Sequence, residues 1–543
     1  MRMEYDYVIV GAGSAGCVLA NRLSADPSVS VALLEAGGSD AKLEVRMPAG
    51  FAKLFKTPCD WNFTTAGQAG LSGRELYWPR GRMLGGSSSL NAQMWVRGHR
   101  ADYDGWNVPG WSYDEVLPYF RRAERRVGSN RGGVYGGDGP IHISELRSPN
   151  VTTAAFLAAC EELGLTRLEE LNGPSNEGYC PTPVTQNRGR RWSAADAYLR
   201  PALRRPNLTV VTGAHARRVL LEGGRATGVE YGPGPGPGGS GGAAGPGGTV
   251  VRARREVILS AGAIGSPHLL MLSGVGPAGE LRAEGVEPLR DLPQVGANLQ
   301  DHLASGIFLQ CPRPVTLAGA ESVPNLLRFL IGRSGMLTSN VGEAVAFIRT
   351  GPAEPAPDIE LIFAPGPFVD HGLTPPSGHG LTIASILLQP ESRGRITLSG
   401  RDVVIDPGYL TAEADVRRQV AGLRRAKELF ATAALAPFTG PPMAPYWGPE
   451  TDEELVRWIR ERSETLYHPV GTCRMGADEE SVVDPSLRVR GISALRVADA
   501  SVMPVINRGH THAPTVMIAE RAAELVAADR AAVGRTTGGA AVA

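Results

Sequence analysis

Short apolar runs alternate with turn residues along the first part of the chain. Residues 5–10 are rich in β-branched side chains and end in glycines, residues 14–23 have the pattern of a helix, and residues 29–34 form a second apolar run. A strand, a glycine turn, a helix and a second strand in this order are typical of the opening of a dinucleotide-binding fold. We therefore predict an α/β fold that begins with a Rossmann-type unit.

Three further apolar runs, at residues 208–211, 219–221 and 228–231, predict short strands of a sheet. They lead into residues 232–248, which consist only of Gly, Pro, Ala and Ser. Such a segment cannot bury enough apolar surface to offset the entropy lost on ordering it, so we predict a surface hairpin tip. The chain then returns as a strand over residues 251–260.

The character of the chain changes after residue 300, where prolines are more frequent and strands alternate, as at residues 381–388 and 395–398. This region predicts a second, mixed α/β domain. A strand-like run at residues 495–498 and a helix at about 514–527 complete the pattern. The predicted division is residues 1–300 for the nucleotide domain, 301–479 for the substrate domain and 480–530 for a return to the first domain.

Composition narrows the classes of partner. A chain of 543 residues is too long for one compact core, and 42% hydrophobic with 20% charged residues is ordinary for a globular protein. Lys+Arg and Asp+Glu each number 55, so no bulk charge favours nucleic acid or an anionic membrane, although local patches stay open. The six cysteines have neither zinc-site nor C-x-x-C spacing, and no apolar run is long enough for a transmembrane helix. We expect a cytoplasmic protein with reduced thiols and no signal peptide.

A glycine triplet marks the predicted nucleotide site. Gly11, Gly13 and Gly16 follow the first strand, and Ser14 opens the helix, whose free N–H groups and dipole favour a pyrophosphate. Glu35 ends the second strand, where its carboxylate can accept hydrogen bonds from a ribose diol. The triplet alone fits FAD and NAD equally well.

Two later clusters of small residues favour FAD over NAD as the cofactor. Residues 81–91 read GRMLGGSSSLN and residues 262–276 read GAIGSPHLLMLSGVG, and their small side chains allow the backbone to run close to a large flat ligand. Both segments resemble the signature patterns of the glucose-methanol-choline (GMC) oxidoreductase family, and the resemblance extends from about residue 7 to residue 527, toward the bacterial alcohol and choline dehydrogenase-like members.

The resemblance implies FAD on a domain assembled from separate segments, with a substrate domain over the reactive face of the flavin. It further implies that five residues lie along the FAD, namely Leu84, Asn91, Val219, Ala261 and Asp499. Some members link FAD covalently to a histidine just before the asparagine. Leu90 stands at that position here, so we expect noncovalent FAD.

Alcohol oxidation needs a base for the hydroxyl proton, and histidine suits because its ordinary pKa of about 6.5 lies near working pH. His468 lies in residues 467–476, YHPVGTCRMG, which are similar to the family's C-terminal catalytic motif. A second motif contains His510 and His512 just before the last predicted helix. Counting back from residues 513–515 assigns His512 as the second catalytic residue, with His510 left as an alternative. We expect no metal site, because the H-x-H pair has no third ligand.

The predicted reaction is oxidation of a primary alcohol to an aldehyde, with electrons passing to O2, a quinone or a redox protein. A cage for choline built from Trp61 and Tyr467 is disfavoured, because Gln310 stands where choline oxidases carry a glutamate. The alternatives are a NAD-dependent dehydrogenase, disfavoured by the two later clusters, and a non-catalytic flavin-binding protein, disfavoured by the two histidine motifs.

Overall fold

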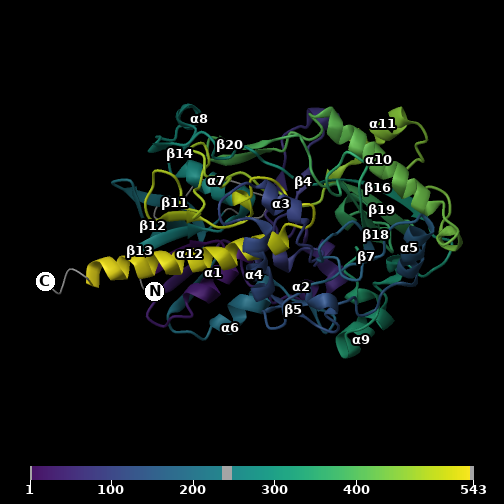
Figure 1. Cartoon of the computed structure of the whole chain (residues 1–543), viewed down its shortest axis with the longest axis horizontal. Helices are drawn as coiled ribbons and strands as arrows, with labels where there is room; N and C mark the ends of the chain where they lie inside the picture. Colours follow the sequence, from purple (N-terminus) through teal and green to yellow (C-terminus); the bar gives the residue numbers. More distant parts are fainter. Residues whose placement is uncertain (1–2, 235–247, 539–543) are drawn as a thin grey trace.

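The structure, a computed structural model, describes residues 3–234 and 248–538 (Figure 1). One sheet with its helices fills the left half of the view and a second sheet the right half. Most of the predicted hairpin tip, residues 232–248, lies outside the described residues. Within those residues, no helix combines the length and the apolar composition needed to cross a bilayer.

The first sheet carries the predicted Rossmann-type unit. Its strands follow the order β10-β2-β1-β13-β12-β11, with β23 also paired to β13. The strands are β1 (Glu4–Val10), β2 (Val31–Glu35), β10 (Leu208–Thr212), β11 (His215–Glu222), β12 (Arg225–Gly232), β13 (Thr249–Leu259) and β23 (Leu495–Val497). The pairings among β10, β2, β1, β13 and β23 are parallel, which requires helices on the sheet faces.

Two helices far apart in sequence lie against each other beside this sheet. Helix α1 (Ser14–Leu23) follows β1, and α12 (His512–Gly538) comes from the C-terminal end of the chain. Figure 1 shows the long yellow α12 beside the purple α1. The predicted return of the C-terminal segment is therefore seen twice, in α12 and in the pairing of β23 with β13.

The second sheet is antiparallel, in the order β22-β16-β19-β18-β17-β7. Its strands are β7 (Gly178–Pro181), β16 (Leu303–Gln310), β17 (Ala344–Ile348), β18 (Ile359–Ala364), β19 (Gly380–Leu387) and β22 (Glu464–Thr465). Helices α5 (Val151–Glu162) and α10 (Glu413–Phe430) pack on it. Because side chains alternate along a strand, Glu360 and Ile362 of β18 share the face opposite to Leu361.

Two details differ from the sequence-based expectation. Strand β7 lies far before residue 301 yet completes the second sheet, so the sheet is not built from one continuous region. The predicted strand at residues 395–398 is β20 (Arg395–Ser399), which pairs with β21 (Asp402–Asp406) in a separate hairpin. Local alternation predicts a strand but carries no information about its partner.

A buried ion pair fixes the segment that crosses between the two sheets. The side chains of Arg97 and Glu124 are 1% and 0% exposed, and Arg97 Nε donates to Glu124 Oε1 at 2.7 Å. Trp95 Nε1 donates to the same oxygen at 2.9 Å. The guanidinium also lies 5.5 Å from the centre of the Phe120 ring. Trp95 and Phe120 are themselves fully buried, so water has little access to either charge.

We predict that Glu124→Ala lowers the free energy of unfolding by about 3–5 kcal/mol, because it leaves the Arg97 charge buried without its partner. Thermal and denaturant unfolding measure the loss. The matched control is Asp114→Ala, which removes the exposed partner of Arg100 and should leave the unfolding midpoint unchanged. Equal stability of the two variants would contradict the role assigned to the buried pair.

Candidate active site

A single cavity joins the two sheets. It contains about 2930 Å³ of space between atoms, part of it open to solvent. One end is lined by the glycine-rich turn after β1 and by the ends of β2 and β13, and the other by the inner face of the second sheet. Six histidines line it, among them His468, His510 and His512. A nucleotide-type end and a histidine end therefore open into the same space.

Backbone packing shapes the nucleotide end. A Cβ on Gly16 would lie 1.8 Å from the carbonyl oxygen of Gly11, so only glycine lets α1 begin so close to β1. Gly11 has a φ of 97°, and its Cβ would lie 2.5 Å from the carbonyl oxygen of Ser260. A Cβ on Gly13, in contrast, would meet nothing within 4 Å. Gly13 therefore leaves room for a ligand at the N-terminus of α1, as a bound pyrophosphate requires.

Glu35 is held in place by two backbone amides. Its Oε2 accepts from Ala12 N and its Oε1 from Gly37 N, both at 2.8 Å. Burial raises the pKa of Glu35 to about 7, and the two amide donors oppose this effect. Each oxygen keeps a lone pair for a further donor in the cavity. This geometry fits the ribose hydroxyls of a dinucleotide.

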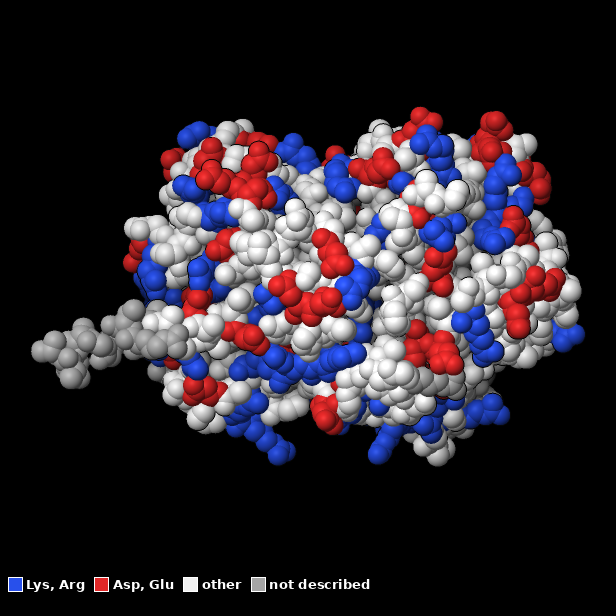
Figure 2. All heavy atoms as spheres, in the orientation of Figure 1, with Lys and Arg blue, Asp and Glu red and all other residues white. Residues whose placement is uncertain are grey.

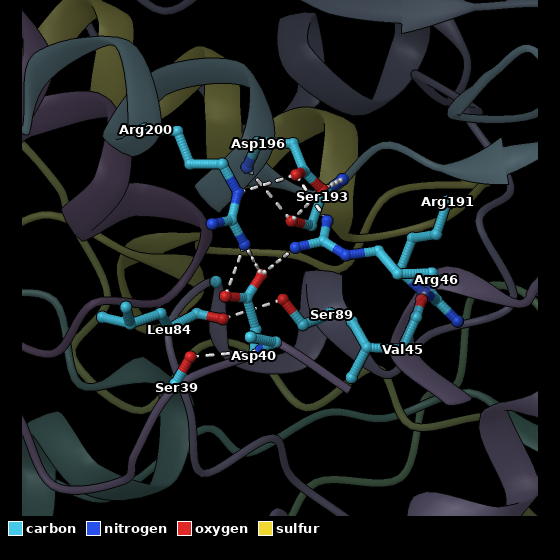
Figure 3. A network of polar contacts seen from close by, with 12 residues as sticks. Ser39, Asp40, Val45, Arg46, Leu84, Ser89, Arg191, Ser193, Asp196 and Arg200 are labelled. Carbon is cyan, nitrogen blue, oxygen red and sulfur yellow. Dashed lines mark hydrogen bonds and ion pairs between the residues drawn. The ribbon is translucent and has the colours of Figure 1, made fainter. Parts of the chain in front are cut away.

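Arg191 and Asp40 belong to a group of polar contacts (Figure 3), and Arg191 extends it to Asn91. Arg191 Nη1 donates to Asn91 Oδ1 at 2.8 Å, and Arg191 Nε donates to Val45 O at 2.9 Å. Nearby, Arg200 Nη2 donates to both oxygens of the buried Asp40, at 2.6 and 2.5 Å. Burial lowers the pKa of Arg191 to about 9. The network anchors one wall of the cavity in a fixed position.

Most of the cofactor residues predicted from sequence reach the cavity. Those that line it are Gly11, Gly13, Ser14, Glu35, Asn91, Ala261 and Asp499. Asp499 Oδ2 also accepts from Gly262 N at 2.9 Å, at the start of α7 (Gly262–Leu272). Gly16, Leu84 and Val219 lie outside the lining. In the region of Val219, the lining residues are instead Ala214 and Ala216.

His468 is fixed through two consecutive residues, Asp301 and His302. Its backbone N–H donates to Asp301 Oδ1 at 2.6 Å, and its ring Nδ1 lies 2.9 Å from His302 Nδ1. His302 Nε2 lies 3.0 Å from the carbonyl oxygen of Leu388, which can only accept. A neutral His302 therefore carries its hydrogen on Nε2 and accepts at Nδ1. His468 must in turn donate from Nδ1, so its Nε2 holds an unprotonated lone pair.

Burial keeps both of these rings neutral. It lowers the pKa of His302 to about 3. It also takes the pKa of His468 well below its ordinary value, with further lowering by the charges of His510, His302 and Arg80. Tyr467, just before His468, has a φ of 68°, a conformation that costs about 1–3 kcal/mol in a residue other than glycine. This backbone turn aims the His468 ring into the cavity.

The ring packed against His468 is His510. The two ring centres are 4.9 Å apart at an interplanar angle of 77°. His510 Nε2 lies 3.0 Å from Oε1 of Glu360, whose side chain is 0% exposed. The other oxygen of Glu360 has no partner among the described residues.

His512 faces the other end of the cavity. Its Nδ1 lies 3.1 Å from Ser14 Oγ in the glycine-rich turn, and its Nε2 is buried without a partner in the described part of the chain. Burial lowers the pKa of His512 to about 4. The sequence-based pairing of His468 with His512 thus differs from the contact in the structure, which joins His468 to His510.

Sequence reasoning missed three residues of this arrangement, Asp301, His302 and Glu360. His302 belongs to no recognisable motif. The sequence does indicate Glu360, because it is the single charged residue in the otherwise apolar strand Ile359–Ala364. A carboxylate buried in such a strand needs a partner.

The wall beside His468 is mainly aromatic and apolar. Phe51, Phe55 and Phe368 line it, and Phe55 lies 6.0 Å from the ring of Tyr467. Trp61 is stacked on Phe63 at 5.7 Å, so one face of the proposed choline cage is already covered. Gln310 is exposed and lies outside the lining.

Comparison with known families agrees with this geometry. Residues 5–304 and 390–519 match the N- and C-terminal models described as GMC oxidoreductase.

The chain belongs to the GMC oxidoreductase family. It is 49% identical to an uncharacterised GMC-type oxidoreductase of Mycobacterium tuberculosis over 97% of this chain and 100% of the relative. It is 42% identical to an alcohol dehydrogenase [acceptor] of Pseudomonas putida, over 96% and 95%. A solved formate oxidase of Aspergillus oryzae, a variant whose mutation affects FAD modification, aligns with a TM-score of 0.88 and 28% identity, covering 97% of this chain and 98% of that chain.

These comparisons confirm several predictions for this GMC oxidoreductase. The family is confirmed, and so is the α/β fold with a Rossmann-type cofactor domain and a substrate domain. The class is confirmed as an oxidoreductase acting on CH–OH groups, with FAD as the cofactor.

We predict that Glu35→Ala weakens retention of FAD by about 1–3 kcal/mol, the cost of leaving hydrogen-bonding partners unpaired in a buried site. The measurement is FAD affinity after removal and titration of the cofactor. The control is Glu161→Ala on the exposed surface of α5, which should bind FAD like the parent protein. Unchanged affinity in Glu35→Ala would exclude Glu35 from the ribose site.

Proposed function

We propose that this enzyme oxidises a primary alcohol to an aldehyde, with FAD bound noncovalently across the cavity. FAD, when bound, supplies the two-electron acceptor that takes a hydride from the alcohol carbon. Gly13 and Ser14 hold the pyrophosphate, and Glu35 holds the ribose. Leu90 offers no nitrogen for a covalent link. The substrate would lie at the histidine end, against the second sheet.

The observation that carries the proposal is the hydrogen-bond chain through His302 to His468. It leaves His468 Nε2 as a neutral nitrogen with a free lone pair beside the cavity. Such a nitrogen can accept the hydroxyl proton while the hydride leaves the carbon. Asp301 fixes the backbone of the same residue, so the base keeps one orientation. His468 is therefore the general base.

His510 supplies the second function, a hydrogen-bond donor to the alcohol oxygen. Glu360 pairs with its Nε2, so an imidazolium at His510 has a buried counter-ion and Nδ1–H remains for the substrate. The charge on His510 is also one cause of the lowered pKa of His468. Two neighbouring rings with different hydrogen-bond partners suit a base and a donor. The contact distance favours His510 over His512 for this role.

The apolar side chains of the wall favour an uncharged aliphatic or aromatic alcohol over a quaternary ammonium alcohol. Trp61, which a cage for a quaternary ammonium would use, is stacked on Phe63 and has one ring face covered. The named relative from Pseudomonas putida, an alcohol dehydrogenase [acceptor], agrees with this class. The electron acceptor is O2, a quinone or a redox protein.

We predict that His468→Ala slows anaerobic flavin reduction about 100-fold or more, through loss of the base. His510→Ala should slow it on a similar scale, since donors to a developing oxyanion are worth about 10²–10³ in rate. His512→Ala should reduce its flavin at a rate near that of the parent enzyme and lose FAD more readily. Rapid mixing with a panel of primary alcohols measures the rates, and admission of air then reports oxidase activity. If His512→Ala slowed flavin reduction strongly and His510→Ala only weakly, the result would support the pairing of His468 with His512 that the sequence predicts.

The pH dependence of flavin reduction follows from the lowered pKa of His468. The base acts in its neutral form, so the rate rises with pH through that pKa and is level above it. Because the pKa lies well below 6.5, the rate should be constant at neutral pH and fall only in the acid range. Stopped-flow measurements across pH test this. A rise centred at or above pH 7 would contradict the neutral His302–His468 chain.

We predict that Glu360→Gln slows flavin reduction at least tenfold, because the amide has no negative charge to pair with an imidazolium at His510. Combining Glu360→Gln with His510→Ala should add little to the effect of His510→Ala alone, since residues that act as a unit are not additive. Rate effects that multiply in the double variant would show that Glu360 acts independently of His510.

A further inference from the structure

One short helix exposes an unusual amount of apolar surface. Helix α9 (Val323–Gly332) carries five exposed apolar side chains: Val323 at 70%, Leu326 at 37%, Leu327 at 50%, Leu330 at 50% and Ile331 at 84%. Its opposite face is buried through Asn325 and Phe329. Large apolar side chains scattered singly are normal on a surface, but five on one ten-residue helix form a patch that needs a partner.

Arginines border this patch. Arg328 lies on the helix and Arg333 follows its end, while Arg147 Nη2 donates to the Gly332 carbonyl oxygen at 3.4 Å. Arg188 and Arg190 approach from the turn around Gly189, where a Cβ would lie 2.5 Å from the carbonyl oxygen of Arg333.

Two of these five arginines, Arg190 and Arg333, repel each other. The pKa of Arg190 is lowered by burial and then by the charge of Arg333. In the described part of the chain, none of the five forms an ion pair with a carboxylate. In Figure 2, the lower edge of the molecule, where Figure 1 shows α9, carries uncharged atoms bordered by blue side chains. The surface is thus both apolar and positively charged.

The helix also lies next to the cavity wall. Phe329 packs with Met47 and Ala49 at the start of η1 (Pro48–Leu54), and Phe51 of the same 3₁₀ segment lines the cavity. A partner bound at α9 would therefore lie one layer of side chains from the proposed substrate end.

We propose that α9 docks on an anionic lipid surface, with its apolar side chains at the acyl boundary and its arginines among the headgroups. A ten-residue helix is about 15 Å long, too short to span a bilayer but suited to lie in its interface. A second copy of the chain would cover the apolar residues equally well. It would, however, bring two sets of unpaired arginines together, which a negatively charged surface does not.

The test uses the full-length, FAD-loaded enzyme and sedimentation with vesicles. Vesicles of phosphatidylcholine with phosphatidylglycerol should bind the enzyme at low salt, and high salt or pure phosphatidylcholine should weaken binding. Leu327→Gln with Ile331→Gln should lower the affinity at least tenfold, through loss of buried apolar surface. Arg328→Gln with Arg333→Gln should lower it about fivefold for each arginine. Flavin content and turnover of a water-soluble alcohol should stay unchanged in both.

The matched control is Leu289→Gln, which changes an apolar side chain that is 61% exposed in a different part of the surface and should bind vesicles like the parent enzyme. Sedimentation velocity gives the oligomeric state of the same samples. The proposal would be overturned if the parent enzyme did not sediment with anionic vesicles, or if the α9 variants bound them as tightly as the parent enzyme. A parent dimer that dissociates in Leu327→Gln/Ile331→Gln would also overturn it, by assigning α9 to a second copy.

Discussion

Direct contact between backbones is the constraint on which this structure depends. Gly16 touches the Gly11 carbonyl, Gly11 lies against Ser260, and a Cβ on Gly86 would lie 2.7 Å from the Cα of Gly13. Segments from three distant parts of the sequence converge there with no space for side chains. Main-chain amides rather than side chains therefore form the wall of the nucleotide end, and any larger residue would separate α1 from the sheet.

The histidine end follows a different principle, in which buried hydrogen-bond partners fix the tautomer and orientation of neighbouring rings. Leu388 offers only an acceptor, which fixes the tautomer of His302, which in turn fixes that of His468. Glu360 constrains His510 in a comparable way. Two adjacent rings are thus each oriented by a different buried partner. The second sheet contributes most of these partners, which explains why the site needs both sheets.

Sequence patterns predict the parts of this site that depend on local geometry. The glycine triplet, Ser14 and Glu35 form one strand–turn–helix–strand unit, and their spacing predicts where they lie. The assignment of His512 over His510 was different, because it used a count along the chain. His512 is the first residue of α12 and turns toward Ser14, whereas His510 precedes the helix and turns toward β18. A shift of two residues at a helix N-terminus changes the side-chain direction, and only tertiary packing reveals it. The partners of β7 and β20 were unpredictable for the same reason, since pairing is a long-range property.

The pairing of β23 with β13 has a consequence for how the protein is made. The parallel core of the first sheet is complete only when Val497 has been synthesised, and α1 receives its cover from a helix that begins at His512. An emerging chain on the ribosome therefore carries an unfinished sheet with an uncovered apolar face through nearly all of its translation. A product terminated before β23 would present that open edge to chaperones and proteases.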